Sequence, residues 1–92
     1  MPSDDLHHSH PDILKRLKRA NGHLNKVMSM MVEGRSCTDL AQQLHAVEQA
    51  VRQAKRTLIQ DHIDHCLDRS VRQVEEGETV NTDEFKQIVK YL

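Results

Sequence analysis

The feature that most constrains the fold of this chain is a row of apolar residues spaced alternately four and three positions apart. Residues with this spacing lie on one face of an α-helix. A first row ends before Gly34, a residue type that commonly terminates helices, and a second row begins after Ser36, a common N-cap residue. The rows consist of Ile13, Leu17, Ala20, Leu24, Val27 and Met31, and of Leu40, Leu44, Val47, Val51, Ala54 and Leu58. The sequence therefore predicts two amphipathic helices.

The second of these helices is predicted to be much the longer. It runs from about residue 37 to about residue 75, before Gly77, and measures roughly 55–60 Å, against about 33 Å for the first helix. A short third helix is expected after Thr82, which would cap it. Its apolar face consists of Phe85, Ile88, Val89 and Leu92. We therefore expect an all-α fold of three helices, short, long and short, with no strands.

The apolar row of the long helix is longer than the first helix of the same chain can cover. Since an apolar row left open requires a second chain, we predict a dimer in which the first two helices of each protomer form an antiparallel four-helix bundle. We expect residues 1–11 to form a flexible tail that contains histidines, and residues 12–92 to form a single helical domain.

Composition narrows the functional class. One Phe, one Tyr and no Trp cannot supply the aromatic anchors of a substrate pocket, and no catalytic triad spacing, phosphate loop or HExxH motif is present. We therefore expect neither an enzyme nor a binder of a small-molecule substrate. The start of the chain lacks a basic segment followed by an apolar run, and no stretch is long and apolar enough for a membrane span, so we expect a cytoplasmic protein with no membrane partner. Two cysteines in such a chain indicate metal or redox chemistry before a disulfide.

His62 and Cys66 are the central candidates for metal ligands. They stand four positions apart, so their side chains lie one above the other on a helix face. Cys37 precedes His62 by 25 positions, about 37 Å along a helix, and cannot reach the pair within one chain. If two long helices pair antiparallel about an axis near residues 50 and 51, Cys37 of one protomer lies beside His62 and Cys66 of its partner.

The donor set of two thiolates and one imidazole narrows the choice of metal. Such soft and borderline ligands suit Cu(I), Zn(II) or Ni(II) and disfavour Mg(II) and Ca(II). Three ligands satisfy Cu(I), whereas Ni(II) or Co(II) would need a further ligand. Candidates for this additional ligand are the tail histidines His7, His8 and His10. We favour Cu(I), with Ni(II) or Co(II) as alternatives.

Several segments of the chain together resemble the bacterial metal-sensing repressors of the CsoR/RcnR/FrmR type, over residues 12–92. The segments are Arg16-Leu17-Lys18-Arg19-Ala20-Asn21-Gly22-His23-Leu24, the Cys37 position, Gln42-Gln43-Leu44-His45-Ala46-Val47 and His62-Ile63-Asp64-His65-Cys66. The resemblance implies a dimer of dimers, a homotetramer, that binds operator DNA without a helix-turn-helix and releases it when ligand arrives. It also implies that the ligands of the copper-sensing branch fall on Cys37, His62 and Cys66.

Basic residues are concentrated early in the chain, where residues 13–35 carry six basic side chains against one acid. With the resemblance, this distribution predicts contacts to DNA, made to phosphates and groove shape rather than to base edges. The candidates are Lys15, Arg16, Lys18, Arg19, Arg52, Lys55 and Arg56.

Alternatives to a metal-responsive repressor of efflux or resistance genes remain open from the residues alone. A repressor of the same fold could sense persulfide through its two thiols, or formaldehyde through Cys37 and the Pro2 amine. A metal-buffering protein without DNA binding would use the same ligands and show no salt-dependent DNA affinity.

Overall fold

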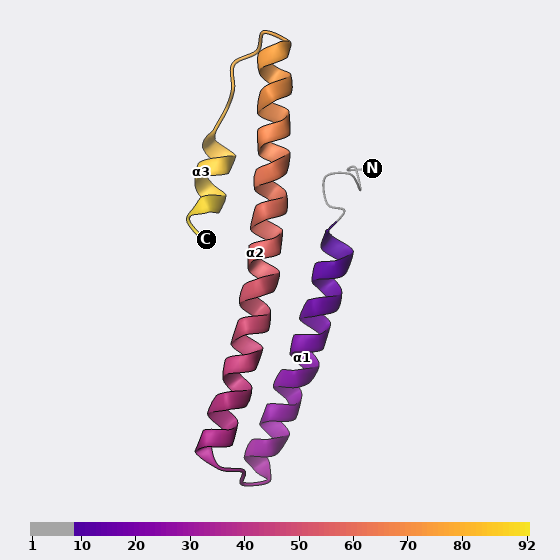
Figure 1. Ribbon diagram of the computed structural model, residues 1–92, viewed down its shortest axis with the longest axis vertical. Helices are drawn as coiled ribbons and strands as arrows, with labels where there is room; N and C mark the ends of the chain where they lie inside the picture. Colours follow the sequence, from indigo (N-terminus) through magenta and orange to yellow (C-terminus); the bar gives the residue numbers. More distant parts are fainter. Residues whose placement is uncertain (1–8) are drawn as a thin grey trace. The chain divides into compact units, whose positions relative to one another are not determined.

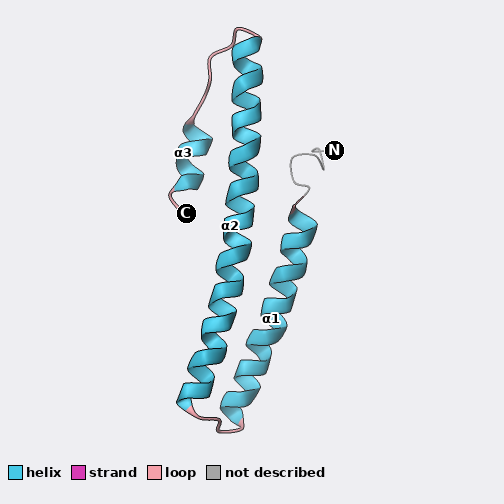
Figure 2. Ribbon diagram, viewed as in Figure 1, coloured by secondary structure: helices cyan, strands magenta, loops and turns pink. Residues whose placement is uncertain are grey.

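The computed structural model describes residues 9–92. Figure 1 shows three helices, α1 (His10–Val32), α2 (Cys37–Glu75) and α3 (Asp83–Val89). Helices and the loops between them account for all of the described residues, none of which lies in a strand (Figure 2). The predicted all-α class is therefore confirmed. Most of the predicted tail lies outside the described residues, and α1 begins within its last two residues.

Both long helices end in the same backbone arrangement. The Arg35 N–H donates to the Met30 carbonyl and the Gly34 N–H to the Met31 carbonyl, at 3.1 Å each. This pattern is a Schellman motif, which requires a left-handed residue after the helix, and Gly34 supplies it with φ 79°. Gly77, with φ 77°, ends α2 in the same manner.

The starts of the helices depend on side-chain caps. The Ser36 Oγ accepts a hydrogen bond of 3.1 Å from the Asp39 N–H, so the predicted cap of α2 is present. The cap of α3 differs from the prediction. Thr82 makes no side-chain capping bond, and the Asn81 Oδ1 accepts the Asp83 N–H instead, at 2.9 Å.

The described chain divides into two compact parts, and the first is His10–Lys55. In this part α1 and the first half of α2 form an antiparallel helical hairpin (Figure 1). Alternate members of the two apolar rows are buried between the helices, Leu40 is half-buried, and the others are exposed. The buried residues are Ile13, Ala20, Val27, Met30, Val47 and Ala54.

One member of the first predicted row is wrong. Met30 is 6% exposed and packs in the core, whereas Met31 is 56% exposed. On an ideal α-helix Met31 lies at the same angle as Ile13, because the intervening steps add up to five full turns, so helix geometry alone does not select Met30 for the core.

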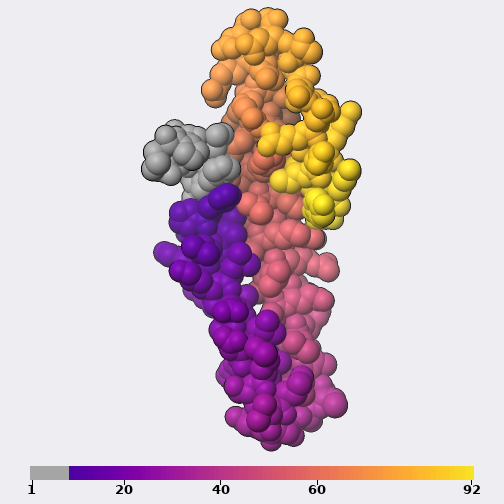
Figure 3. Space-filling view, turned by 180° about the vertical axis from the view of Figure 1, so that it is seen from behind, coloured from indigo at the N-terminus to yellow at the C-terminus, as the bar shows by residue number. Residues whose placement is uncertain are grey.

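The second compact part comprises Arg56–Leu92 with Ser9. Here α3 lies against the second half of α2, yellow against orange in Figure 3. Ile59 and Cys66 are the buried apolar residues of this part of α2, and Phe85, Ile88 and Val89 of α3 are half-buried. Leu92, predicted on this face, is exposed because α3 ends at Val89. Even the 39-residue α2 lacks the sustained apolar stretch needed to cross a membrane, as do the other described helices.

Candidate metal centre

His62, Cys66 and Glu84 form a cluster in which one potential ligand atom from each residue lies within 4.8 Å of the others. The period of α2 brings His62 and Cys66 onto one face, as predicted from their spacing. Glu84 comes from the first turn of α3. Metal bonds to imidazole and thiolate are about 2.0–2.3 Å long, so donors at these separations can reach one ion with small side-chain movements.

The two α2 donors are shielded from solvent. Cys66 is 8% exposed, and the buried Nε2 of His62 makes no hydrogen bond to any described residue. Glu84 Oε1 lies 3.0 Å from this nitrogen, a contact that is an ion pair only when His62 is protonated. A buried polar atom without a partner is costly, and an imidazole nitrogen in this condition is available to a metal ion.

Arg69 borders the cluster on the same face of α2. Its Nη2 donates to Glu84 Oε2 at 2.8 Å and to Cys66 Sγ at 3.8 Å. These contacts raise the pKa of Arg69, the Glu84 hydrogen bond most of all. The hydrogen bond from Arg69 and the nearby positive charge lower the pKa of Glu84. Next to these groups is a cavity of about 210 Å³, lined by Cys66, Arg69, Ser70, Gln73, Asn81 and Glu84.

Cys37 is not part of this cluster. It is exposed in the first turn of α2, within the other compact part, beside a shallow hollow lined by Thr38, Ala41, Gln42 and His45. One chain therefore brings together two of the three predicted ligands.

The remaining histidines have other surroundings. His7 and His8 lie outside the described residues, and His10 is exposed at the start of α1. The His65 Nδ1–H donates to the Asp61 carbonyl at 2.8 Å, and Asp61 also accepts a 2.8 Å bond from the Ser9 Oγ. His23 pairs with Gln43, and His45 with Gln49. Among the described residues, none of these histidines belongs to the candidate cluster.

Glu84 was missed by sequence reasoning. An acidic residue in the first turn of a helix is common, because it complements the helix dipole, and Asp83 beside it carries the same signal. Only the packing of α3 on α2 distinguishes the two.

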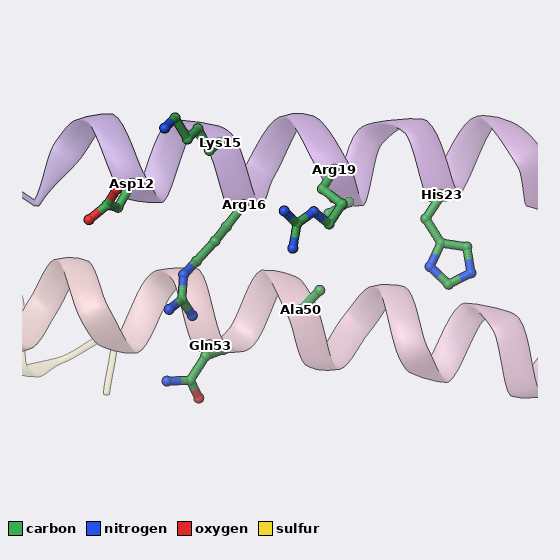
Figure 4. A pocket seen from close by; sticks show the side chains of 8 residues that line it. Asp12, Lys15, Arg16, Arg19, His23, Ala50 and Gln53 are labelled. Atoms are coloured by element: carbon green, nitrogen blue, oxygen red, sulfur yellow. The ribbon is translucent and has the colours of Figure 1, made fainter.

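The basic residues predicted to contact DNA are all exposed. A cavity of about 620 Å³ between α1 and α2 is bordered by Lys15, Arg16 and Arg19, with a single acid, Asp12. Figure 4 shows Arg16 extending from α1 toward Gln53 of α2. Lys18, Arg52 and Lys55 are exposed in the same part, and Arg56 is exposed at the start of the other.

Comparison with known proteins decides the family. The model of the family described as "Metal-sensitive transcriptional repressor" matches residues 9–91. The chain belongs to this family. The predicted resemblance is therefore confirmed, and the repressors of this family are not enzymes, in agreement with the sequence prediction.

Three curated relatives of this chain are described as copper-sensing transcriptional repressors. CsoR of Mycobacterium ulcerans is 34% identical to this chain, and the match covers 63% of this chain and 50% of the relative. RicR of Mycobacterium tuberculosis is 35% identical, and the match covers 62% of this chain and 59% of the relative. CsoR of Bacillus subtilis is 29% identical over 85% and 79%. The chain thus spans only half to three fifths of the length of the mycobacterial relatives. No solved structure matches it at a significant level.

Proposed function

We propose that this chain is a Cu(I)-responsive repressor that binds operator DNA and releases it when Cu(I) occupies a centre containing His62 and Cys66. The observation that carries the proposal is the shielded pair of soft donors, a buried thiol and a buried imidazole nitrogen without a hydrogen-bond partner. A thiolate and an imidazole favour Cu(I) over harder ions. The copper-sensing relatives support the same metal.

Two soft donors leave a coordination position for Cys37 of a partner subunit. Cys37 is exposed, as a thiol contributed to another chain must be. When bound, the metal supplies short bonds that tie donors of two chains together. Ni(II) and Co(II) are the alternatives, because they would accept the Glu84 carboxylate oxygen more readily than Cu(I).

DNA binding is proposed for the basic face of α1. Lys15, Arg16 and Arg19 border one cavity on this face, and a group of basic side chains can neutralise phosphates of a DNA backbone. Phosphate contacts release counterions, so the affinity for DNA should fall steeply as salt concentration rises. A metal-buffering protein would show no such dependence.

The test is His62→Ala, which should weaken Cu(I) binding by at least about tenfold, because an outer-sphere change alone costs 10–100-fold, and should leave DNA affinity without metal unchanged. Anaerobic titrations with Cu(I), Ni(II) and Co(II), with release of a labelled promoter fragment as a second readout, measure both properties. His45→Ala is the matched control on the same helix. Release of DNA by the His62 variant on addition of metal would contradict the proposal. A covalent sulfur or formaldehyde adduct in the mass spectrum of the protein that has released DNA would favour the persulfide or formaldehyde sensor.

A further inference from the structure

Arg69 places a positive charge beside one of the candidate metal ligands. It follows Cys66 by three positions, so the two side chains lie on one side of α2, and its Nη2 lies 3.8 Å from the Cys66 Sγ. The same nitrogen donates to the Glu84 Oε2 at 2.8 Å, a bond that holds the guanidinium in this position. Because arginine stays protonated at physiological pH, the charge beside the sulfur is permanent.

The charge of the proposed centre depends on the charge of the metal ion. Two thiolates and a neutral imidazole around Cu(I) leave one net negative charge, which attracts a guanidinium. The same ligands around a divalent ion such as Zn(II) leave no net charge. The two complexes differ by one unit of charge whichever of these ligands take part, and both form from the same metal-free protein. A fixed cation beside the ligands therefore stabilises the Cu(I) complex more than the Zn(II) complex.

Burial sets the size of this difference. Cys66 is 8% exposed, so little water screens the charge on its sulfur, whereas Arg69 is half-exposed and its charge is partly screened. The expected effect lies between that of an exposed ion pair and that of a hydrogen bond to a charged group. It is large enough to change the preference between two metals that the same ligands accept.

We infer that Arg69 is a specificity-determining residue, whose guanidinium beside the Cys66 sulfur favours Cu(I) over divalent ions. This inference rests on the proposed function. Arg69 acts without binding the metal, because its charge stabilises the anionic complex through the thiolate.

The substitution Arg69→Gln should lower the affinity for Cu(I) relative to that for Zn(II). The ratio of the two association constants should fall about three- to tenfold. Anaerobic competition against chromophoric chelators, one for Cu(I) and one for Zn(II), measures both constants in the assembled protein. Zn(II) is the suitable comparison, because its filled d shell imposes no geometry of its own.

Two further variants show whether the charge itself is responsible. Arg69→Lys keeps a cation at the same position and should retain most of the wild-type ratio. Arg72→Gln is the matched control, because it removes an exposed arginine about one turn further along α2, where water and salt screen the charge. It should leave the ratio unchanged.

Glu84 requires a separate control. Removing Arg69 also frees the Glu84 Oε2, and a divalent ion accepts a carboxylate oxygen more readily than Cu(I) does. The comparison is therefore repeated in a Glu84→Gln background, which has no carboxylate at this position. Arg69→Gln should lower the ratio there as well, and a ratio that no longer falls would show that Glu84, not the charge beside Cys66, sets the preference.

The outcomes separate the inference from the proposed function. If Cys66→Ser weakens Cu(I) binding but Arg69→Gln leaves the ratio unchanged, with both affinities intact or equally reduced, the proposed function stands and the inference is wrong. A ratio that falls as far in Arg69→Lys as in Arg69→Gln would also overturn the inference. If Cys66→Ser binds Cu(I) as tightly as the wild type, the proposed function fails and the inference fails with it.

Discussion

At the scale of single residues, the Glu84 carboxylate of α3 contacts two side chains of α2, the Arg69 guanidinium and the His62 imidazole. Both Arg69 and Glu84 are about half exposed, so water screens their attraction, and an exposed pair of this kind adds little stability. The main effect of the pair is to orient α3, because it joins α3 to the face of α2 that contains the candidate ligands.

The lowered pKa of Glu84 gives this contact a pH dependence. A carboxyl whose pKa falls on folding stabilises the protein above its unfolded pKa, and the stabilisation is lost as pH falls through the lower folded value. Between about pH 5 and about pH 3, urea denaturation should show a steeper loss of stability for the wild type than for Glu84→Gln. Glu76→Gln, which changes an exposed acid in the turn after α2, should retain the wild-type slope. Equal slopes in all three proteins would contradict a native-state interaction of Glu84.

The residues of the candidate site differ in how far the sequence could predict them. His62 and Cys66 were predictable because helix periodicity alone places positions four apart together. Glu84 and Arg69 were not, since a charged residue on a helix surface is usually solvated, and only the packing of α3 selects these two from many.

At the scale of elements, the ends of α1 and α2 are fixed by glycines in a conformation that other residues rarely adopt. Gly34 and Gly77 have φ values of 79° and 77°, and a Cβ at either would meet no atom within 4 Å. The need for glycine is therefore one of backbone conformation, not of space. Gly22 lies inside α1, where an added Cβ also meets no atom within 4 Å.

These glycines predict opposite effects of the same substitution. Gly34→Ala should destabilise the protein by about 1–2 kcal/mol, the cost of a left-handed backbone for a residue with a Cβ. Gly22→Ala should stabilise it by about 0.5–1 kcal/mol, because alanine is the better helix former. Thermal unfolding midpoints that shift in the same direction would contradict these assignments.

Helix ends were predictable for a local reason, since Gly34, Gly77 and Ser36 act within a few residues of their own positions. The exchange of Met31 for Met30 in the core was not, because the choice depends on how the end of α1 packs against α2. The capping of α3 by Asn81 similarly depends on the path of the loop before it.

At the scale of the whole molecule, the hairpin leaves half of its apolar residues uncovered. Leu44 and Val51 on α2, with Leu17 and Leu24 on α1, are each at least 38% exposed. Exposed apolar rows of this length indicate an interface, and they are the basis on which we retain the prediction of an antiparallel dimer. The apolar pattern of the sequence predicts that a second chain covers this face. It does not predict the register of the two chains, because both copies have the same spacing of four and three along the whole row.

The antiparallel dimer can be tested by mixing two inactive chains. In a dimer of Cys37→Ser with Cys66→Ser, one site retains every ligand and the other loses both thiols. Equal amounts that exchange freely should therefore recover about a quarter of the wild-type Cu(I) sites, while each variant alone recovers none. Thiolate charge-transfer absorption measures the number of sites. No recovery after verified subunit exchange would contradict a ligand set shared between chains.

The position of Cys37 at the opposite end of α2 from Cys66 has a consequence for how such a protein responds in a cell. If a partner subunit completes the ligand set, a monomer lacks the complete copper site. Dilution of the protein then lowers copper binding even when the metal concentration stays constant. The cellular concentration of the repressor would then help to set the copper concentration at which it responds, because mass action couples subunit assembly to metal binding.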